Sequence, residues 1–436
     1  MKRFLSLLAV ALAAVVPAAL FRLLGWRPNP VVDTAVFGIA VLAAGFMLSW
    51  GAEAAEKRIS QGLILALVAL VTVLPEYAVD MYYAYQAGKA PASNYVHYAA
   101  ANMTGANRLL VGVAWPLIAL LHWWNSRQRA IALATVNLVE VGFLMLASLY
   151  AFVIVLRDRI GIEDSVVLLL IFSAYLWVAG RTPKVETDQD EDDEPGPAAA
   201  LATLTPARQW VWMSGLTVVA ALVILASAEP FAESIVASGR LFKVDEFLLI
   251  QWLAPLASEA PAVVIAVLFV LSKRAEGGLT TMISDKINQW TLLVGMLPLA
   301  MSIGAGGVTH LPLDARQHEE FFLTAAQSLF AVSLLLKLRF GIVSALTLAV
   351  LFGVQVALAV FYRDDPARTI ASLTWLGWLY IALASGMFVL GVPSAWRAAR
   401  QLGQAGAQRL RQQTRPGTGP EDARIKRVKV DGPAKR

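Results

Sequence analysis

Two glutamates lie inside long apolar stretches of the sequence, where a membrane-spanning chain would meet lipid. Glu76 stands in "LVTVLPEYAVDMYYAYQ", with Asp80 one helical turn after it, and Glu259 stands in "LAPLASEAPAVVIAV". A carboxylate at the centre of an inserted helix costs about 2.5–3.5 kcal/mol. Acids kept at that cost usually serve ion or proton pathways, so both glutamates are candidate ligands of a transported cation.

The two glutamates occupy matching positions of an internal repeat. A shift of 183 residues places Glu76 on Glu259, and one "LLVG" on a second "LLVG". A shift of 180 residues aligns "LRDRIGIEDSVVLLLIF" (156–172) with "LKLRFGIVSALTLAVLF" (336–352). Each half then holds about five helices, with its glutamate on the second. An odd number of spans sends the second copy into the membrane from the opposite side, which makes an inverted repeat.

Each glutamate has a polar partner further along its repeat, Asn102 in the first half and Asp285 in the second. Inverted-repeat transporters bind their ions near the bilayer midplane, where the repeats meet. Three carboxylates and the Asn102 amide oxygen provide the all-oxygen ligand set that Ca²⁺ prefers. We therefore expect Glu76, Glu259 and Asp285 to be metal ligands that Asn102 assists.

Prolines stand beside both glutamates. Pro75 precedes Glu76, and Pro255 and Pro261 flank Glu259. A proline removes a backbone donor and frees a carbonyl oxygen, and freed carbonyls at membrane depth are tolerated beside protein or water. The pattern predicts that both glutamate helices are interrupted at the site.

The whole composition predicts an all-α polytopic membrane protein. Hydrophobic residues make up 58% of the 436 residues and charged residues 15%, whereas soluble proteins carry about a quarter charged residues. Roughly twelve apolar stretches are long enough to span a bilayer. They lie near 4–24, 33–51, 60–85, 97–123, 130–156, 164–181, 209–238, 245–272, 282–306, 320–336, 340–361 and 370–392.

Six segments are expected: two five-helix repeats, an extra helix at each end, a linker between the repeats and a C-terminal tail. The acidic, Pro-rich linker between the repeats is expected to be solvated, with calcium sensing as the alternative. Residues 1–24 have a cleaved signal peptide as their alternative reading. The segments are 1–30 (extra helix), 31–181 (first repeat), 182–208 (linker), 209–361 (second repeat), 362–395 (extra helix) and 396–436 (basic disordered tail).

The distribution of lysine and arginine favours a cell-membrane protein with both termini in the cytoplasm. Four loops that would then face inward carry pairs of basic residues, and the basic tail joins them; the pairs are Lys57 and Arg58, Arg127 and Arg129, Lys273 and Arg274, and Lys337 and Arg339. The chain has no cysteine, which excludes disulfides and cysteine-ligated metals. The net charge of +5 lies mostly in loops and the tail, so we expect no nucleic-acid partner.

The repeat motifs resemble those of the calcium/cation antiporter superfamily, the group of the sodium/calcium exchangers. That family carries G-T-S-x-P-E on one helix and G-N-x-x-G-S-N on the next. Here the first repeat reads "VTVLPE" and "ANMTGAN", and the second reads "APLASE" and "SDKINQ". The resemblance implies that Glu76 and Glu259 are the central cation ligands, that Asn102 and Asp285 complete the site, and that transport proceeds by alternating access.

The family's hydroxyl positions before each glutamate, which often contact sodium, are mostly replaced. Thr72 remains in the first repeat, beside Val73, and the second repeat has Pro255 and Leu256. We keep Thr72 as a candidate cation ligand. The losses leave the counter-ion open between sodium and protons.

Several further polar residues are candidates for the second shell of the site or for ion coupling: Asp80, Arg108, Ser258 and Lys286. Lys286 is expected to snorkel, to neutralise the site or to couple protons. Arg108 is expected to neutralise Asp80 or to bind Glu140. We expect Glu140 and the nearby Asn137 to serve helix packing.

The sequence thus predicts a secondary cation antiporter of the sodium/calcium exchanger type, not an enzyme, that uses no cofactor. It would move Ca²⁺ in exchange for Na⁺ or H⁺. The alternatives are a Na⁺/H⁺ or Ca²⁺/H⁺ exchanger in which Lys286 couples the ions, and a non-transporting membrane scaffold or sensor derived from an exchanger. The expected partners are inorganic cations and the lipid bilayer, and the sequence does not determine the oligomeric state.

Overall fold

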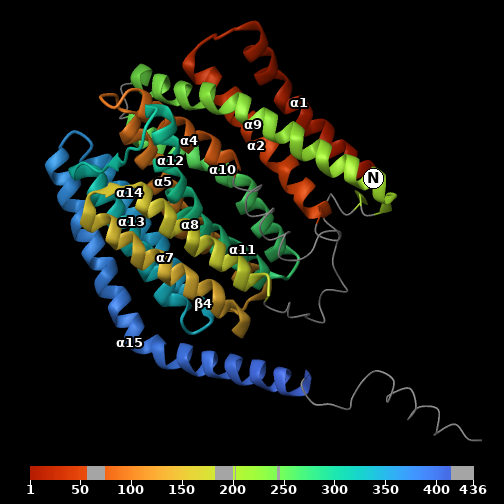
Figure 1. Ribbon diagram of the computed structural model, residues 1–436, viewed down its shortest axis with the longest axis vertical. Coiled ribbons are helices and arrows are strands. Elements are labelled where there is room, and N and C mark those ends of the chain that lie inside the picture. The colour runs from red at the N-terminus through yellow and green to blue at the C-terminus, as the bar shows by residue number, and fades with distance from the viewer. Residues whose placement is uncertain (56–73, 182–199, 202, 243–245, 414–436) are drawn as a thin grey trace, which may run out of the picture.

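The computed structural model describes residues 1–55, 74–181, 200–201, 203–242 and 246–413, and these form a bundle of long helices (Figure 1). The helices are α1 (Lys2–Leu24), α2 (Pro30–Ala55), α4 (Leu74–Lys89), α5 (Tyr95–Leu109), α6 (Trp115–Ser126), α7 (Leu138–Arg157), α8 (Ile162–Ala179), α9 (Pro206–Phe242), α10 (Glu246–Leu271), α11 (Ala275–Asn288), α12 (Val294–Ala305), α13 (Ala315–Leu335), α14 (Ile342–Phe361) and α15 (Pro366–Gln413). Two π-helical turns, η1 (Leu110–Ala114) and η5 (Gln289–Leu293), join α5 to α6 and α11 to α12. The short strands are β1 (Ala130–Ala132), β2 (Arg159–Ile160), β3 (Leu311–Pro312) and β4 (Arg339–Gly341), and η2 (Thr135–Asn137) is a 3₁₀ turn.

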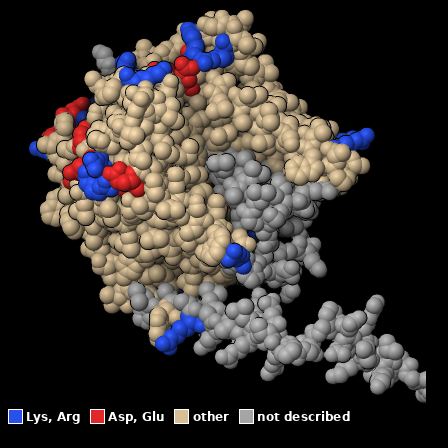
Figure 2. All heavy atoms as spheres, viewed as in Figure 1, with Lys and Arg blue, Asp and Glu red and all other residues tan. Residues whose placement is uncertain are grey.

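The structure confirms the all-helical membrane fold. Within the described residues, ten helices are long and apolar enough to cross a membrane. Helix α13 is not among them, because its buried faces carry polar side chains such as Glu320, Thr324 and Gln327. The apolar stretch predicted near 60–85 lies partly in 56–73, outside the described residues. Broad parts of the surface in Figure 2 are free of charged side chains, as a lipid-facing surface requires.

Each half contributes the same succession of elements, as the inverted repeat predicts. The sequence α2, α4, α5–α6, α7 and α8 is repeated as α9, α10, α11–α12, α13 and α14, and the π-helical turn recurs inside the third unit. Helices η1 and η5 thus make the third unit of each half a single long helix with one irregular turn.

The short strands show the repeat at the level of single backbone bonds. Strand β1 pairs with β4, and β2 pairs with β3, both antiparallel. The amide of Leu133 donates to the carbonyl of Leu338, and the amide of Leu313 donates to the carbonyl of Asp158. Asp158 and Leu338, 180 residues apart, both have φ of 51°. Each strand pair is therefore the repeat image of the other, and each ties one half of the chain to the other half.

The predicted interruption at Glu259 is wrong, because α10 runs unbroken through Pro255 and Pro261. A transmembrane helix tolerates proline where neighbouring helices pack against the freed backbone. Helix α2 packs closely on the proline rings at Gly45, where a Cβ atom would lie 2.6 Å from Cγ of Pro261 and 3.6 Å from Cγ of Pro75. The irregular backbone lies on the following helix instead, in η5.

Helices α1 and α15 lie outside the repeats and pack on opposite parts of the bundle (Figure 1). One face of α1 is buried at regular helical spacing, by Phe4, Leu8 and Ala11 among others, and Arg22 pairs with Glu229 of α9 at 2.7 Å. Helix α15 continues to Gln413, beyond the start of the tail that was expected to be disordered from 396. Alanine, glutamine, arginine and leucine dominate this stretch, and they favour helix.

Candidate functional site

Helices α4 and α10 bring Glu76 and Glu259 together in the interior of the bundle. Glu76 is 1% exposed and Glu259 is 7% exposed. Gln289, the first residue of η5, donates from Nε2 to Glu259 Oε1 at 2.7 Å and to Glu76 Oε2 at 3.5 Å. The structure thus places the two predicted ligands on either side of a single amide.

Asp80 and Asn102 form a second polar pair beside the two glutamates. Asp80 follows Glu76 by one turn of α4 and is fully buried, and Asn102 of α5 is 1% exposed. Asn102 Nδ2 donates to Asp80 Oδ1 at 2.9 Å. Asp80, a candidate for the second shell of the site or for ion coupling, is therefore shielded from solvent and linked to the predicted ligand Asn102.

Buried oxygen atoms without a hydrogen-bond donor gather around these residues. They are Glu76 Oε1, Asp80 Oδ2, Asn102 Oδ1, Asp285 Oδ2 and Gln289 Oε1. An unsatisfied buried polar atom costs about 1–3 kcal/mol, and more if it is charged. Five such acceptors in one region are the arrangement that a cation or protons would stabilise.

Asp285 and Lys286 are adjacent on α11 and both are buried, at 8% and 0% exposure. Lys286 does not snorkel: its ammonium donates to the Asn107 carbonyl oxygen at 2.6 Å and to Asn107 Oδ1 at 2.9 Å. It also lies over the ring of Trp290, 5.5 Å from the centroid. These contacts tie the Lys286 side chain to α5. Oδ2 of the neighbouring Asp285 has no hydrogen-bond donor.

Arg108 corrects one expectation, because it binds neither Asp80 nor Glu140. Its Nη1 pairs with Glu320 of α13 at 2.5 Å, and Gln251 of α10 donates to the same carboxylate at 3.0 Å. No spacing or motif links Arg108 to Glu320, because the two residues are more than 200 positions apart. This fully buried pair joins α5, α10 and α13 next to the site.

Asn137 serves helix packing, as predicted. Its Nδ2 donates to Glu276 of α11 at 2.9 Å, so it ties η2 to α11. Of the remaining candidates, Ser258 donates back to carbonyls of its own helix, at 3.3 Å to Ala254 and 3.4 Å to Pro255. Thr72 lies outside the described residues.

Gln289 is the site residue that the sequence reading missed. It falls where the motif G-N-x-x-G-S-N has its serine, so a polar residue at that position was the available signal. Among the residues that the structure describes, no three acidic or imidazole side chains converge closely enough to hold a metal ion by themselves. The predicted trio Glu76, Glu259 and Asp285 therefore needs amide oxygens such as those of Gln289 and Asn102 to complete a cation shell.

Two segments, 31–180 and 212–361, match the family model described as sodium/calcium exchanger protein. They cover well over half of the chain and coincide with the two repeats seen in the structure. A comparison with curated protein sequences finds no match.

Solved structures share the fold. The crystal structure of the H⁺/Ca²⁺ exchanger CAX has a TM-score of 0.85 and 36% sequence identity, over 94% of this chain and 99% of that chain. Native YfkE has a TM-score of 0.57 at 12% identity, over 80% and 97% of the two chains. The sodium-calcium exchanger NCX_Mj soaked with Na⁺ and Sr²⁺ has a TM-score of 0.50 at 18% identity, over 75% and 97%. The last two likenesses concern the fold alone.

Proposed function

Because the chain belongs to the sodium/calcium exchanger protein family, we propose that it moves Ca²⁺ across the cell membrane in exchange for protons. It is a secondary cation exchanger and not an enzyme. The observation that carries the choice of site is that Glu76 and Glu259, one from each repeat, bind the same amide of Gln289 and are surrounded by unpartnered oxygen atoms.

The chemistry of the pair supports protons as the counter-ion. Gln289 Nε2 donates to both carboxyl groups, at 2.7 Å and 3.5 Å, so Glu76 and Glu259 lie close enough for a proton on one of them to relieve their mutual repulsion. Calcium, by contrast, needs both groups as carboxylates. The same two side chains would therefore hold either protons or Ca²⁺, which is what exchange requires. The replaced sodium hydroxyl positions and the 36% identity to an H⁺/Ca²⁺ exchanger support the same choice.

In this proposal Glu76 and Glu259 are the central ligands, and oxygen atoms of Gln289, Asn102 and Asp285 complete the shell. The inverted repeat supports alternating access, because two halves of opposite orientation can open the same site to either side. Asn107 holds the Lys286 side chain beside the site with two hydrogen bonds.

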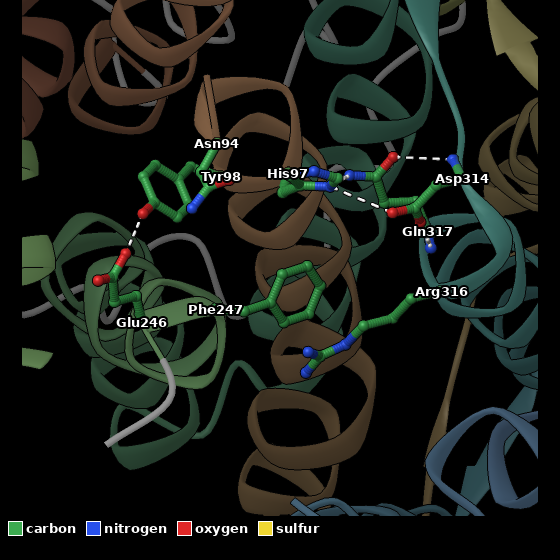
Figure 3. A pocket seen from close by; sticks show the side chains of 8 residues that line it. All are labelled: Asn94, His97, Tyr98, Glu246, Phe247, Asp314, Arg316 and Gln317. Carbon is green, nitrogen blue, oxygen red and sulfur yellow. Dashed lines mark hydrogen bonds and ion pairs between the residues drawn. The ribbon is translucent and has the colours of Figure 1, made fainter. Parts of the chain in front are cut away.

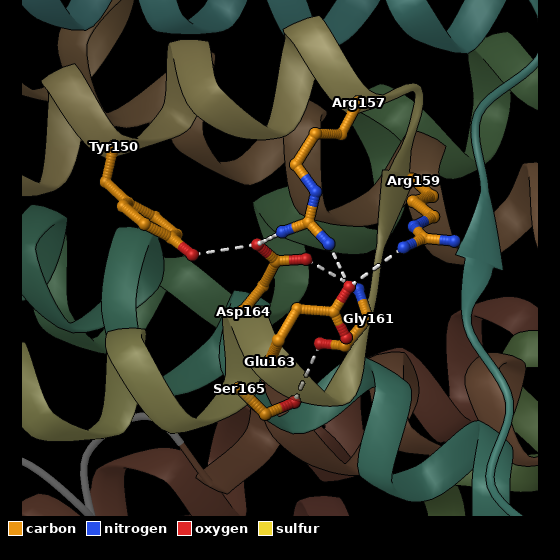
Figure 4. A network of polar contacts seen from close by, with 7 residues as sticks. All are labelled: Tyr150, Arg157, Arg159, Gly161, Glu163, Asp164 and Ser165. Carbon is orange, nitrogen blue, oxygen red and sulfur yellow. Dashed lines mark hydrogen bonds and ion pairs between the residues drawn. The ribbon is translucent and has the colours of Figure 1, made fainter.

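We also propose that both termini are cytoplasmic. Arginines at the face where α5, α10 and α13 begin are paired with acids: Arg157 with Asp164 at 2.9 Å, for example, in the network that joins α7 to α8 (Figure 4). In Figure 2 the acidic side chains lie in the upper half of the visible face, whereas basic ones also lie along its lower edge. That distribution supports placing the face with the paired arginines outside.

The test is uptake of radiolabelled calcium into proteoliposomes, driven separately by an outward proton gradient and an outward sodium gradient. We expect uptake with the proton gradient. Glu76→Gln and Glu259→Gln should each lower the rate at least about 100-fold, the equivalent of about 2.8 kcal/mol, because each removes a ligand charge. Glu229→Gln is the matched control, since Glu229 lies on α9 in an exposed pair with Arg22. Uptake driven only by the sodium gradient would overturn the assignment of the proton as counter-ion. Full activity of both site variants would overturn the assignment of Glu76 and Glu259 as ligands.

A further inference from the structure

A pocket of about 480 Å³ opens at the face where α5, α10 and α13 begin (Figure 3). Tyr98 and His97 of α5 line one side, Glu246 of α10 a second, and Asp314, the N-cap residue of α13, a third. Asp314 Oδ2 lies 3.3 Å from His97 Nδ1. Arg316 also lines the pocket, and Glu246 is paired with Arg240 at 2.7 Å, so the pocket is polar and carries charges of both signs.

A file of polar side chains leads from this pocket to the cation site. Helices α4 and α5 run antiparallel. Residues four apart on either helix are separated by about 6 Å along its axis, so each polar side chain lies about one turn deeper than the one before it. Asn102 lies one turn below Tyr98 on α5 and donates to Asp80 at 2.9 Å. Asp80 in turn lies one turn from Glu76 on α4. Oδ2 of Asp80 and Oδ1 of Asn102, both on fully or almost fully buried side chains, have no donor.

Tyrosine rings separate the pocket from this file. The ring of Tyr98 lies 5.8 Å from that of Tyr83 and 5.8 Å from that of Tyr95, both edge to face. Tyr83 is fully buried one turn outward from Asp80, and its hydroxyl donates to the Ala232 carbonyl oxygen of α9 at 3.1 Å. Edge-to-face aromatic packing of this kind fills the space between helices and excludes water.

One hydrogen bond holds the outermost ring in place. The Tyr98 hydroxyl donates to Glu246 Oε2, and Arg240 donates from Nε to the other oxygen, Oε1, at 2.7 Å. Figure 3 shows the Tyr98 side chain directed toward Glu246 on the neighbouring helix. The ring is 5% exposed, so in this conformation it closes the way from the pocket to Asn102.

From this geometry we infer that the pocket is the outer vestibule of the exchanger, and that Tyr98, locked by Glu246, is the gate between the vestibule and the cation site. A hydrated cation enters the pocket and passes when the Tyr98–Glu246 bond opens. Asp80 and Asn102 then offer the first oxygen atoms below the gate. This inference rests on the proposed exchange function, which supplies the ion that passes.

The natural absence of cysteine allows a direct test by labelling single cysteines. Asn94→Cys reports on the pocket, which Asn94 lines, and Asn102→Cys reports on the space below the gate. A membrane-impermeant maleimide is added to the outside of vesicles of known orientation. With Tyr98 intact, we expect Asn94→Cys to be labelled at least about 10-fold faster than Asn102→Cys.

Opening the gate should change only the labelling rate of Asn102→Cys. Tyr98→Ala should accelerate labelling of Asn102→Cys at least about 10-fold, and Tyr98→Phe, which keeps the ring and loses the hydroxyl, should accelerate it less. Tyr150→Phe is the matched control, because Tyr150 also donates to an acid at this face, Asp164 at 2.8 Å, outside the pocket (Figure 4). It should leave labelling unchanged. If Tyr98→Ala fails to fold, Glu246→Ala, which removes the acceptor of the Tyr98 hydroxyl, tests the same bond.

Equal labelling of Asn94→Cys and Asn102→Cys with Tyr98 intact would overturn the gate, as would unchanged Asn102 labelling in all gate variants. Labelling of Asn94→Cys only from the opposite side of the membrane would overturn the outer placement. Because labelling needs no transported ion, a failure of calcium uptake with the expected labelling pattern would count against the proposed function and not against the gate.

Discussion

The charged side chains in and around the site are all buried, but they differ in the partners that they bind. Arg108 and Glu320 form a direct ion pair, and Lys286 is satisfied by two oxygen atoms of Asn107. Glu76 and Glu259 have no cationic partner in hydrogen-bond contact among the described residues; they share the amide of Gln289. Since an unpaired buried charge is costly, the two glutamates are the groups with most to gain from a bound cation.

At this scale the sharpest prediction concerns Gln289. Gln289→Leu keeps much of the side-chain volume but removes the amide donor and the unpartnered Oε1. Losing one such interaction costs about 1–2 kcal/mol, so the apparent affinity for calcium in proteoliposome uptake should fall about 5- to 30-fold. Gln209→Leu, which replaces another buried glutamine far along the chain on α9, is the control. Unchanged calcium affinity in Gln289→Leu would remove Gln289 from the site.

The elements around the site approach one another more closely than ordinary helix pairs. A Cβ atom on Gly105 of α5 would lie 1.9 Å from the Gln251 carbonyl oxygen of α10, so only glycine permits this contact. Small residues at helix interfaces are a common means of close packing in membranes. The contact sets the separation of the helix that carries Asn102 from the helix that carries Glu259.

Gly105→Ala should therefore push α5 and α10 apart. We expect a loss of several kcal/mol in the free energy of unfolding, of the order found for overpacked cores or more, together with loss of calcium transport. Gly142→Ala on α7 is the matched control, because a Cβ there meets nothing within 4 Å; it should be neutral or stabilising by up to about 1 kcal/mol. Thermal unfolding in detergent measures both. Equal stability of the two variants would show that α5 and α10 can separate without cost.

For the whole molecule, the candidate site lies where two inverted halves meet, and its proposed ligands come from both. Glu76 and Asn102 belong to the first half, and Glu259, Asp285 and Gln289 to the second. The strand pairs β1·β4 and β2·β3 also join one half to the other. A cation at the site therefore binds the two halves together and should stabilise the molecule as a unit.

Calcium should accordingly raise the melting temperature of the purified protein. A ligand at 100 times its dissociation constant adds about 2.7 kcal/mol to the stability of the folded state. Because Ca²⁺ binds carboxylates in their deprotonated form, protons compete with it, and the stabilisation by calcium should shrink as the pH falls. The double variant Glu76→Gln/Glu259→Gln should show neither effect. A calcium-dependent shift that persists in that variant would place the ion elsewhere.

The sequence by itself determined the membrane class and the five-helix repeat, and it singled out the two glutamates that we propose as cation ligands. Hydrophobicity and the repeat are local or periodic properties, and a charged residue inside an apolar run is visible without any knowledge of its neighbours. The motif likewise marked Asn102 and Asp285 by their distance along the chain from each glutamate.

Only the tertiary structure decided which side chains contact one another. The partner of Arg108 is Glu320, Lys286 binds Asn107, and Gln289 bridges the glutamates, because contacts between distant helices depend on their packing and not on sequence spacing. Helix α10 likewise stays continuous through two prolines because α2 packs against it. Local sequence patterns show which residues cost free energy to bury. The packing of the helices determines which hydrogen-bond or ion-pair partner each of them finds.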